Sequence, residues 1–347
     1  MILPLLLTVA TVAVPVSPQP PWPCPVPAGW DLLAQATLPR EGLDGQPIGG
    51  FSAAVAEPQP GPAAGPILWL LSDAPRPYLL PVRGVETMGS APLRIGRRVP
   101  LTTTAGDPFP DPLDGEGMVL RGEDLWIVSE GRRTVEQPAR LLRFDRRSGR
   151  LREALDLPED WRTAPGRGLG ANQGPESLTL LPPGFESLLV AAERPLLQDR
   201  PGQVRLLAFG PLASALAPTG QPAFRPLGSF DLPLEGPAWG LTDLLAWPGE
   251  GGPAGLLGLI RGYEAPARWW ARLVLLPLPD QAAAPLRPMR QWDLLAAGLT
   301  PDNWEGLAAG PPLSDGRPTL VLVSDDNFNP LQASLIARVA PRCASTP

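Results

Sequence analysis

The sequence predicts an all-β fold, a β-propeller of about five four-stranded blades, and two observations support this prediction. An apolar run that ends in a small residue and an acid recurs at 68–73, 125–130, 188–193 and 320–325, and a fifth run, 256–261, ends in Arg. Short apolar runs bounded by turn residues are typical of buried strands. The chain also combines 50 Pro and 37 Gly with 11 Trp. This composition indicates many tight turns around a real core rather than disorder.

Each repeat contains further predicted strands around this run. First strands are expected at 50–55, 115–120, 175–180, 242–247 and 304–308. Third strands are expected at 78–82, 140–144, 204–209, 272–276 and 334–339, and fourth strands at 93–100, 151–158, 227–233 and 290–296. Two alternatives stay open at this stage. One is a sixth blade, if a long repeat splits, and the other is a two-sheet β-sandwich.

The last repeat has no fourth strand of its own, and the N-terminal part of the chain can supply it. The segment Trp30-Asp31-Leu32-Leu33-Ala34 matches 292–296, which is a predicted fourth strand. We therefore expect the N-terminal segment to complete the last blade. Such closure removes the exposed sheet edges that an open ring would leave.

The predicted domain is flanked by short segments of different character. Residues 1–20 are a hydrophobic leader with the length of a signal peptide, and 21–28 are a Pro-rich linker. The propeller domain is expected over 29–341, with a tail at 342–347. We expect export to the periplasm or the outside, with an uncleaved leader acting as an anchor as the alternative. In an oxidising compartment Cys24 and Cys343 could form a disulfide that fastens the ring, the alternative being two free thiols.

The charged residues exclude several classes of protein. The net charge is −6, His is absent and all 29 basic residues are Arg. An acidic chain without a basic run is a poor nucleic-acid binder. Without His or Lys the chain has no Ser-His-Asp triad, no His-ligated zinc and no Schiff-base chemistry. We expect a monomer that acts on a small molecule and has no stable membrane span beyond the leader.

Acidic residues recur at equivalent positions of the repeats. We align Glu116, Glu176, Asp243 and Glu305 on four first strands, with Phe51 in the fifth, while Asp73, Glu130, Glu193 and Asp325 end four second strands. First strands line the channel of a propeller, so these acids are expected to ring its mouth. Oxygen-only ligands favour a hard cation such as Ca²⁺. The candidate ligands are Glu116, Glu130, Glu176, Glu193, Asp243, Glu305, Asp325 and Asp326.

Catalytic roles can be assigned to some of these residues as hypotheses. Either Glu116 or Glu305 could be a general base, and Arg132, Arg194 and Arg261 could bind a substrate phosphate or neutralise the acids. Arg133 and Asn172 lie in the same region of the predicted mouth. The competing interpretation is structural: acids at strand ends bond backbone amides of neighbouring turns and hold the blades together. Ser72, Ser129 and Ser324 are expected to be turn hydroxyls, because no His or Lys base can activate them.

Several motifs resemble those of the phytase-like family, which is described by an esterase-like activity of phytase. They are 49–52, 114–117 with 129–131, 172–178, and above all Asn303-Trp304-Glu305-Gly306 and Ser324-Asp325-Asp326-Asn327-Phe328. Ser177 stands where the family pattern usually has Gly. The resemblance covers roughly residues 28–341 and implies a propeller, export and hydrolysis of phosphoesters.

Two other functions remain open: a non-catalytic ligand- or protein-binding propeller, and a lactonase-like calcium hydrolase. The acidic charge and the lack of Lys favour a small or singly charged ester over phytate, whose phosphates call for dense positive charge.

Overall fold

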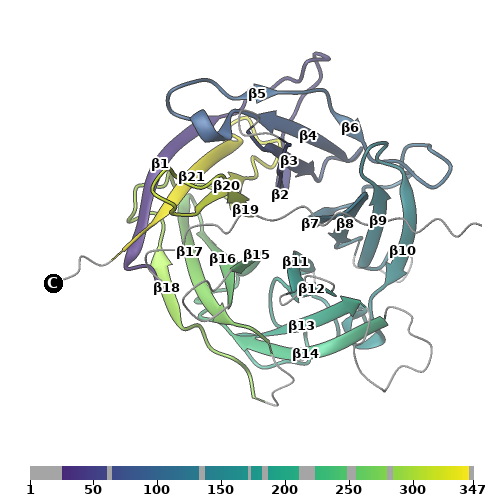
Figure 1. Ribbon diagram of the computed structural model, residues 1–347. Helices are drawn as coiled ribbons and strands as arrows, with labels where there is room; N and C mark the ends of the chain where they lie inside the picture. Colours follow the sequence, from purple (N-terminus) through teal and green to yellow (C-terminus); the bar gives the residue numbers. More distant parts are fainter. Residues whose placement is uncertain are drawn as a thin grey trace, which may run out of the picture.

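The computed structural model describes residues 26–60, 65–132, 137–170, 173–181, 187–210, 223–247, 255–279 and 284–343. Five antiparallel sheets surround one axis and form a five-bladed β-propeller (Figure 1). This confirms the predicted fold and selects five blades over six. In the described ranges helix is limited to two short 3-10 turns, Val85–Thr87 and Glu159–Trp161.

The strands follow the chain from the channel outward in each blade. Blade 1 contains β2 (Phe51–Glu57), β3 (Ile67–Ser72), β4 (Tyr78–Arg83), β5 (Arg94–Ile95) and β6 (Val99–Pro100). Blade 2 contains β7 (Gly115–Arg121), β8 (Asp124–Ser129), β9 (Arg140–Asp145) and β10 (Leu151–Asp156). Blade 3 contains β11 (Pro175–Leu181), β12 (Ser187–Ala192), β13 (Gln203–Gly210) and β14 (Ala223–Asp231). Blade 4 contains β15 (Trp239–Trp247), β16 (Gly255–Glu264), β17 (Arg268–Pro277) and β18 (Arg290–Asp293).

Blade 5 closes the ring as the sequence predicted. Strands β19 (Trp304–Gly310), β20 (Thr319–Ser324) and β21 (Leu335–Arg342) are completed by the N-terminal strand β1 (Gly29–Thr37). Strand β1 pairs antiparallel with β21 from Gly29 opposite Arg342 to Thr37 opposite Leu335. The last described strand therefore lies beside the strand with which the described part begins (Figure 1).

Aromatic packing seals the joint between blades 5 and 4. The Trp30 ring on β1 lies edge-on to Trp292 of β18 and to Trp247 of β15, each at a centroid distance of 5.9 Å. Pairs in this geometry contribute about 0.5–1.5 kcal/mol beyond the area that they bury. Trp30 and Trp292, which begin the two matching segments 30–34 and 292–296, are thus neighbours at the point where the ring closes.

Strand β4 explains why the fourth strand of blade 1 is split. Predicted as one strand at 93–100, it appears as β5 and β6, which pair with different parts of β4. Pro81 lies between these two parts of β4. Because proline has no backbone N–H, it cannot donate the hydrogen bond that a continuous ladder would need at this position. Its carbonyl still accepts a 2.7 Å hydrogen bond from Gly96 N.

The segments outside the propeller are only partly described. Cys24, the leader and most of the 21–28 linker lie outside the described residues, so the Cys24–Cys343 disulfide and the leader stay predictions. No helix in the described part of the chain is long and apolar enough to cross a membrane.

Candidate active site

One backbone feature recurs in every blade and positions the side chains of the channel mouth. The pairing between the first and second strands slips by one residue, which is a β-bulge, in all five blades. The residues at the bulges are Ser52, Glu116, Glu176, Thr242 and Glu305. A bulge bends its strand and redirects a side chain, and bulges are over-represented next to active sites.

The ends of the second strands supply a second set of side chains. Asp73, Glu130, Glu193 and Asp325 each directly follow a second strand and donate their backbone N–H to the residue just before the paired first strand. In blade 4 the residue opposite Gly240 at this position is Arg261. Blade 4 therefore has Thr242 and Arg261 where the other blades carry acids at one or both positions.

These two sets enclose one cavity of about 450 Å³. Its lining includes eight carboxyl groups: Asp73, Asp114, Glu116, Glu130, Glu176, Glu193, Glu305 and Asp325. The cations in the described lining are Arg194 and Arg261, and Ser52, Gln173 and Asn327 add neutral polar groups. The structure thus brings together six of the eight predicted cation ligands, and adds Asp114 and Asp73.

The pKa values of the acids in this cavity reflect crowding. Burial raises the pKa of Glu116 well above its usual range, and the negative charges of Glu130 and Glu305 raise it further. Burial likewise raises the pKa of Glu176, together with the charges of Glu193 and Glu116. Like charges at this density cannot all stay ionised without a cation. Glu116 and Glu176 are therefore shifted towards their protonated forms unless a cation compensates them.

Glu305 has a close cationic partner in the cavity. Arg261 Nη2 and Asn303 Nδ2 both donate to Glu305 Oε1, each over 2.9 Å. Burial raises the pKa of Glu305 to about 7, with the Arg261 charge opposing that rise. A carboxyl with such a pKa is suited to accept a proton near neutral pH. Arg261 Nε is buried without an acceptor among the described residues, so it can donate to a ligand.

Asp73 follows β3 of blade 1 and lies close enough to Glu305 in blade 5 for its charge to raise the pKa of Glu305. Burial raises the pKa of Asp73 to about 8, and the charges of Asp325 and Asp114 add to this rise. Its Oδ1 atom is buried without a hydrogen-bond donor in the described part of the chain. Asp114, beside it, has a left-handed backbone with φ of 53°. Asp adopts this conformation more readily than most residues.

Two of the predicted cation ligands do not line the cavity. Asp243 lies one residue beyond the bulge at Thr242, and its carboxylate accepts from Leu307 N at 2.7 Å and Leu244 N at 2.8 Å. Asp326 accepts from Gly50 N at 2.9 Å and Ser334 Oγ at 3.0 Å. Both acids hold neighbouring blades together, which is the structural role that the sequence analysis left open. The alignment of Asp243 and Phe51 with the other first-strand positions was wrong by one residue.

The predicted arginines also differ in their positions. Arg261 lies in the cavity, whereas Arg132 is exposed and is not part of the described lining. Arg194 lines the cavity, but its guanidinium donates to the carbonyls of Gly236 and Pro237 and so fixes the loop before β15. Arg133 and Asn172 lie outside the described residues.

The serines at the mouth have the role expected from the sequence. Ser72 Oγ donates to Gly49 O over 2.7 Å, and Ser324 Oγ donates to Ala333 O over 3.1 Å. Ser129 Oγ donates to Leu113 O. Each hydroxyl is engaged by a turn, and none has a neighbouring base that would make it a nucleophile.

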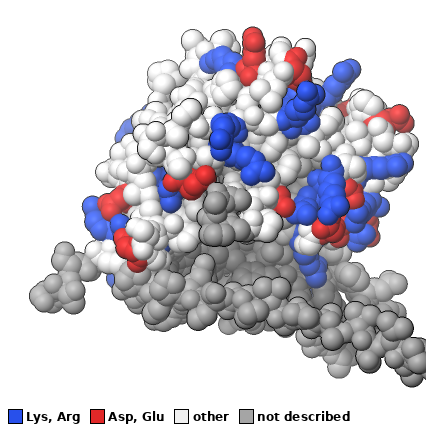
Figure 2. Space-filling view, turned by 45° about the horizontal axis from the view of Figure 1, so that its top comes forward, with Lys and Arg blue, Asp and Glu red and all other residues white. Residues whose placement is uncertain are grey.

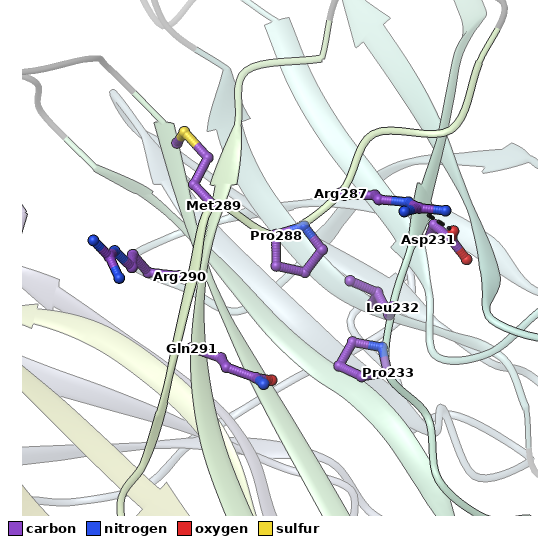
Figure 3. Close-up of a pocket in the computed structure, with 8 residues that line it drawn as sticks. All are labelled: Asp231, Leu232, Pro233, Arg287, Pro288, Met289, Arg290 and Gln291. Atoms are coloured by element: carbon purple, nitrogen blue, oxygen red, sulfur yellow. Dashed lines mark ion pairs between the residues drawn. The ribbon is translucent and has the colours of Figure 1, made fainter.

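A larger cavity of about 590 Å³ lies at the outer rim, between the end of β14 and β18 (Figure 3). The acid in its described lining is Asp231, which is ion-paired with Arg287 over 3.3 Å. The rest of that lining consists of Pro, Leu, Met, Gln and Arg residues. Because its described acid is held in an ion pair with Arg287, we assign the site to the smaller cavity, where many acids converge.

The outer surface shown in Figure 2 has arginines and acids interspersed. Ion pairs at the surface of the protein include Arg98 with Asp44 and Arg140 with Asp156. The described part of this face shows no broad basic area of the kind that binds nucleic acid.

Fold and site define a five-bladed propeller whose channel mouth is an acidic cavity in which Arg261 is ion-paired with Glu305. The chain belongs to the phytase-like family, described as esterase-like activity of phytase, whose model matches residues 46–328. A search of curated proteins finds no match.

Solved structures with a similar arrangement are distant. One is a GH43 glycoside hydrolase engineered for endo-xylanase and exo-arabinofuranosidase activity, with 12% identity and a TM-score of 0.40, covering 82% of this chain and 54% of that chain. Another is a neuraminidase-like protein of A/flat-faced bat/Peru, with 10% identity and a TM-score of 0.39, covering 91% and 96%. A glucose dehydrogenase has 14% identity and a TM-score of 0.35, covering 86% and 84%. This chain spans about half the length of the first of these chains.

Proposed function

We propose that this protein is an exported hydrolase of small esters or phosphoesters, and that the acidic cavity is its active site. The observation that carries the proposal is that Glu305 is closely paired with Arg261, whereas Glu176 in the same cavity is crowded by like charges. Burial raises the pKa of Glu305 to about 7 and raises that of Glu176 well above its usual range. Pairs of carboxyl groups with separated pKa values are the usual basis of acid–base catalysis by carboxyls.

The roles follow from these differences. Of the two candidate bases, Glu305 fits better than Glu116, because the positive charge of Arg261 favours the ionised form of Glu305 near neutral pH. Glu305 takes a proton from water while the water oxygen bonds to the acyl carbon or the phosphorus. Glu176, whose pKa is raised well above its usual range by burial, gives a proton to the departing alcohol oxygen. Arg261 Nε donates to the carbonyl or phosphoryl oxygen, where negative charge develops.

A divalent cation is a second part of this proposal. In the described ranges no group of three or more acids is arranged to hold an ion, but the donor chemistry fits a hard cation. The residues that would hold Ca²⁺ are Asp73, Asp114, Glu116 and Glu130. When bound, Ca²⁺ would polarise the substrate oxygen and lower the pKa of a bound water.

The substrate is expected to carry little charge. Eight carboxyl groups and two arginines line the cavity, so a molecule with many phosphates would meet net repulsion. We therefore propose a small neutral or singly charged ester rather than phytate.

The test is hydrolysis by the purified protein of p-nitrophenyl phosphate, p-nitrophenyl acetate, a simple lactone and phytate, with Ca²⁺ or with chelator. We expect turnover of one of the first two and a loss of at least a hundredfold in Glu305→Gln. Glu235→Gln is the matched control, because Glu235 is an acid half exposed at the rim and paired with Arg272. Absence of turnover of all four compounds would refute the proposal. A Ca²⁺-dependent thermal shift in that case would identify a binding propeller instead.

Export is proposed from the apolar N-terminal run alone. The check is to fractionate cells that express the full chain and to sequence the N-terminus of the mature protein. Retention in the cytoplasm with an intact N-terminus would contradict it.

A further inference from the structure

Phe328 is an apolar side chain at the rim of the acidic cavity. It follows Asn327, which lines the cavity, and its side chain is 43% exposed. Its ring lies against Gly50 together with Asp73: a β-carbon at Gly50 would be 2.5 Å from Phe328 Cε2 and 2.0 Å from Asp73 Oδ1. The ring and a carboxyl group of the proposed active site are therefore immediate neighbours.

The backbone at this position is strained. Asn327 and Phe328 have φ values of 50° and 49°, in the left-handed region. Asn adopts this region readily, whereas it is unfavourable for a bulky residue such as Phe. Such strain persists where the surrounding structure imposes it, and it is concentrated at active sites and ligand clamps.

Two acids impose this conformation. Asp325 accepts from Asn327 N over 2.8 Å, and Asp326 Oδ1 accepts from Phe328 N over 3.1 Å. Asp326 is itself fixed, because Gly50 N donates to the same oxygen and Ser334 Oγ donates to Oδ2. The acid that was predicted as a cation ligand thus holds the Phe328 segment against blade 1.

Core packing does not account for the strain. A ring that stays 43% exposed gains much less from burial than the fully buried Phe51. Leu331 provides a comparison: it is 92% exposed in the same loop, and its backbone is not left-handed. An exposed apolar residue in this loop therefore does not require the conformation that Phe328 has.

We propose that Phe328 forms an apolar subsite, which binds the apolar group of the ester while the ester bond lies among the acids. The inference rests on the proposed function and names its substrate class: an ester with a phenyl-like group on its alcohol or acyl part. It explains why an otherwise polar mouth holds one strained aromatic ring beside Asp73.

The experiment compares hydrolysis of phenyl acetate and methyl acetate by the wild type, Phe328→Asn, Phe328→Leu and the control Leu331→Asn. We expect the preference for phenyl over methyl to fall about tenfold in Phe328→Asn, through KM, and to change little in the other two. Asn tolerates the left-handed backbone, so the melting temperature of Phe328→Asn should stay equal or rise. An unchanged preference, or a lowered melting temperature with that preference intact, would overturn the inference.

A binding measurement separates this inference from the proposed function. Calorimetry with acetanilide and N-methylacetamide, the amide analogues of the two esters, needs no turnover. Tighter binding of acetanilide that is lost in Phe328→Asn supports the subsite even if no ester is hydrolysed. Ester turnover by the wild type with equal binding of both amides would refute the subsite and leave the proposed function standing.

Discussion

Replacement of Arg261 by Gln tests the assignment of Glu305 as the base. Arg261 is ion-paired with two cavity acids: its Nη2 lies 2.9 Å from Glu305 Oε1 and 4.0 Å from Glu193 Oε1. Its side chain is 16% exposed, so solvent screens this charge only weakly. Without the arginine charge, the pKa of Glu305 should rise from its present value of about 7.

The size of the rise can be worked from the geometry. Two unit charges about 4 Å apart attract by about 4 kcal/mol at an effective dielectric constant of about 20. Since one pH unit corresponds to about 1.36 kcal/mol, complete loss would raise the pKa by about three units. Asn303 still donates to the same carboxylate, and neighbouring acids can take up protons. We therefore expect a rise of about one to two units.

The assay is the pH dependence of kcat/KM for a simple ester. If ionised Glu305 is the base, activity of the wild type rises as pH increases through about 7. In Arg261→Gln this rise should occur one to two pH units higher, while Arg261→Lys should keep it close to the wild-type position. Circular dichroism and the melting temperature verify that each variant is folded. A rise that stays within about 0.3 unit of the wild-type position in Arg261→Gln would refute the assignment.

Three further predictions follow from the buried acids. Asp73 and Glu305 have raised pKa values in the folded state, near 8 and 7, so the folded protein binds protons more tightly than the unfolded chain. Their contribution to the free energy of unfolding is therefore present below about pH 4 and is lost as pH rises to about 8. Thermal unfolding should consequently occur at a lower temperature at pH 8 than at pH 5. Asp243→Ala should destabilise the fold by about 1–3 kcal/mol in urea unfolding, because it leaves the buried Leu307 N–H without an acceptor. Gly174→Ala should lower activity at least tenfold with the fold retained, because a β-carbon there would lie 2.3 Å from Glu130 Cγ. Wild-type activity in Gly174→Ala would contradict the role of Glu130 in the site. Wild-type stability in Asp243→Ala would contradict the structural role of Asp243.

The architecture was readable from the sequence because it repeats. Each blade reuses one apolar run, which ends in a small residue and an acid in four of the five, and strand β1 closes blade 5 where the Trp30 segment matched the Trp292 segment. A repeat gives several independent views of each strand, so an error in one copy is corrected by the others. The acidic mouth was predicted for the same reason, since acids at the same strand position must lie at the same end of the channel.

The sequence could not show single-residue slips and reversals of the backbone. A bulge at Thr242 instead of Asp243 turns the acid away from the cavity and into the ladder of the neighbouring blade. In the same way, the turn after Asp325 makes Asp326 an acceptor for backbone N–H groups. The left-handed residues Asp114 and Phe328 gave no pattern of their own, although both stand inside the family-like motifs.

The departure of blade 4 from the repeat gives the acidic mouth two kinds of carboxyl group. If blade 4 carried an acid in place of Arg261, all members of the ring would repel one another, and each would stay protonated or need a cation. With Arg261 present, Glu305 is stabilised as a carboxylate, while Asp73 and Glu116 stay crowded by like charges. Glu305 can therefore accept a proton near neutral pH, and the crowded acids attract positive charge. A single substitution in an otherwise regular ring is thus sufficient to make two chemically different groups from the same kind of side chain.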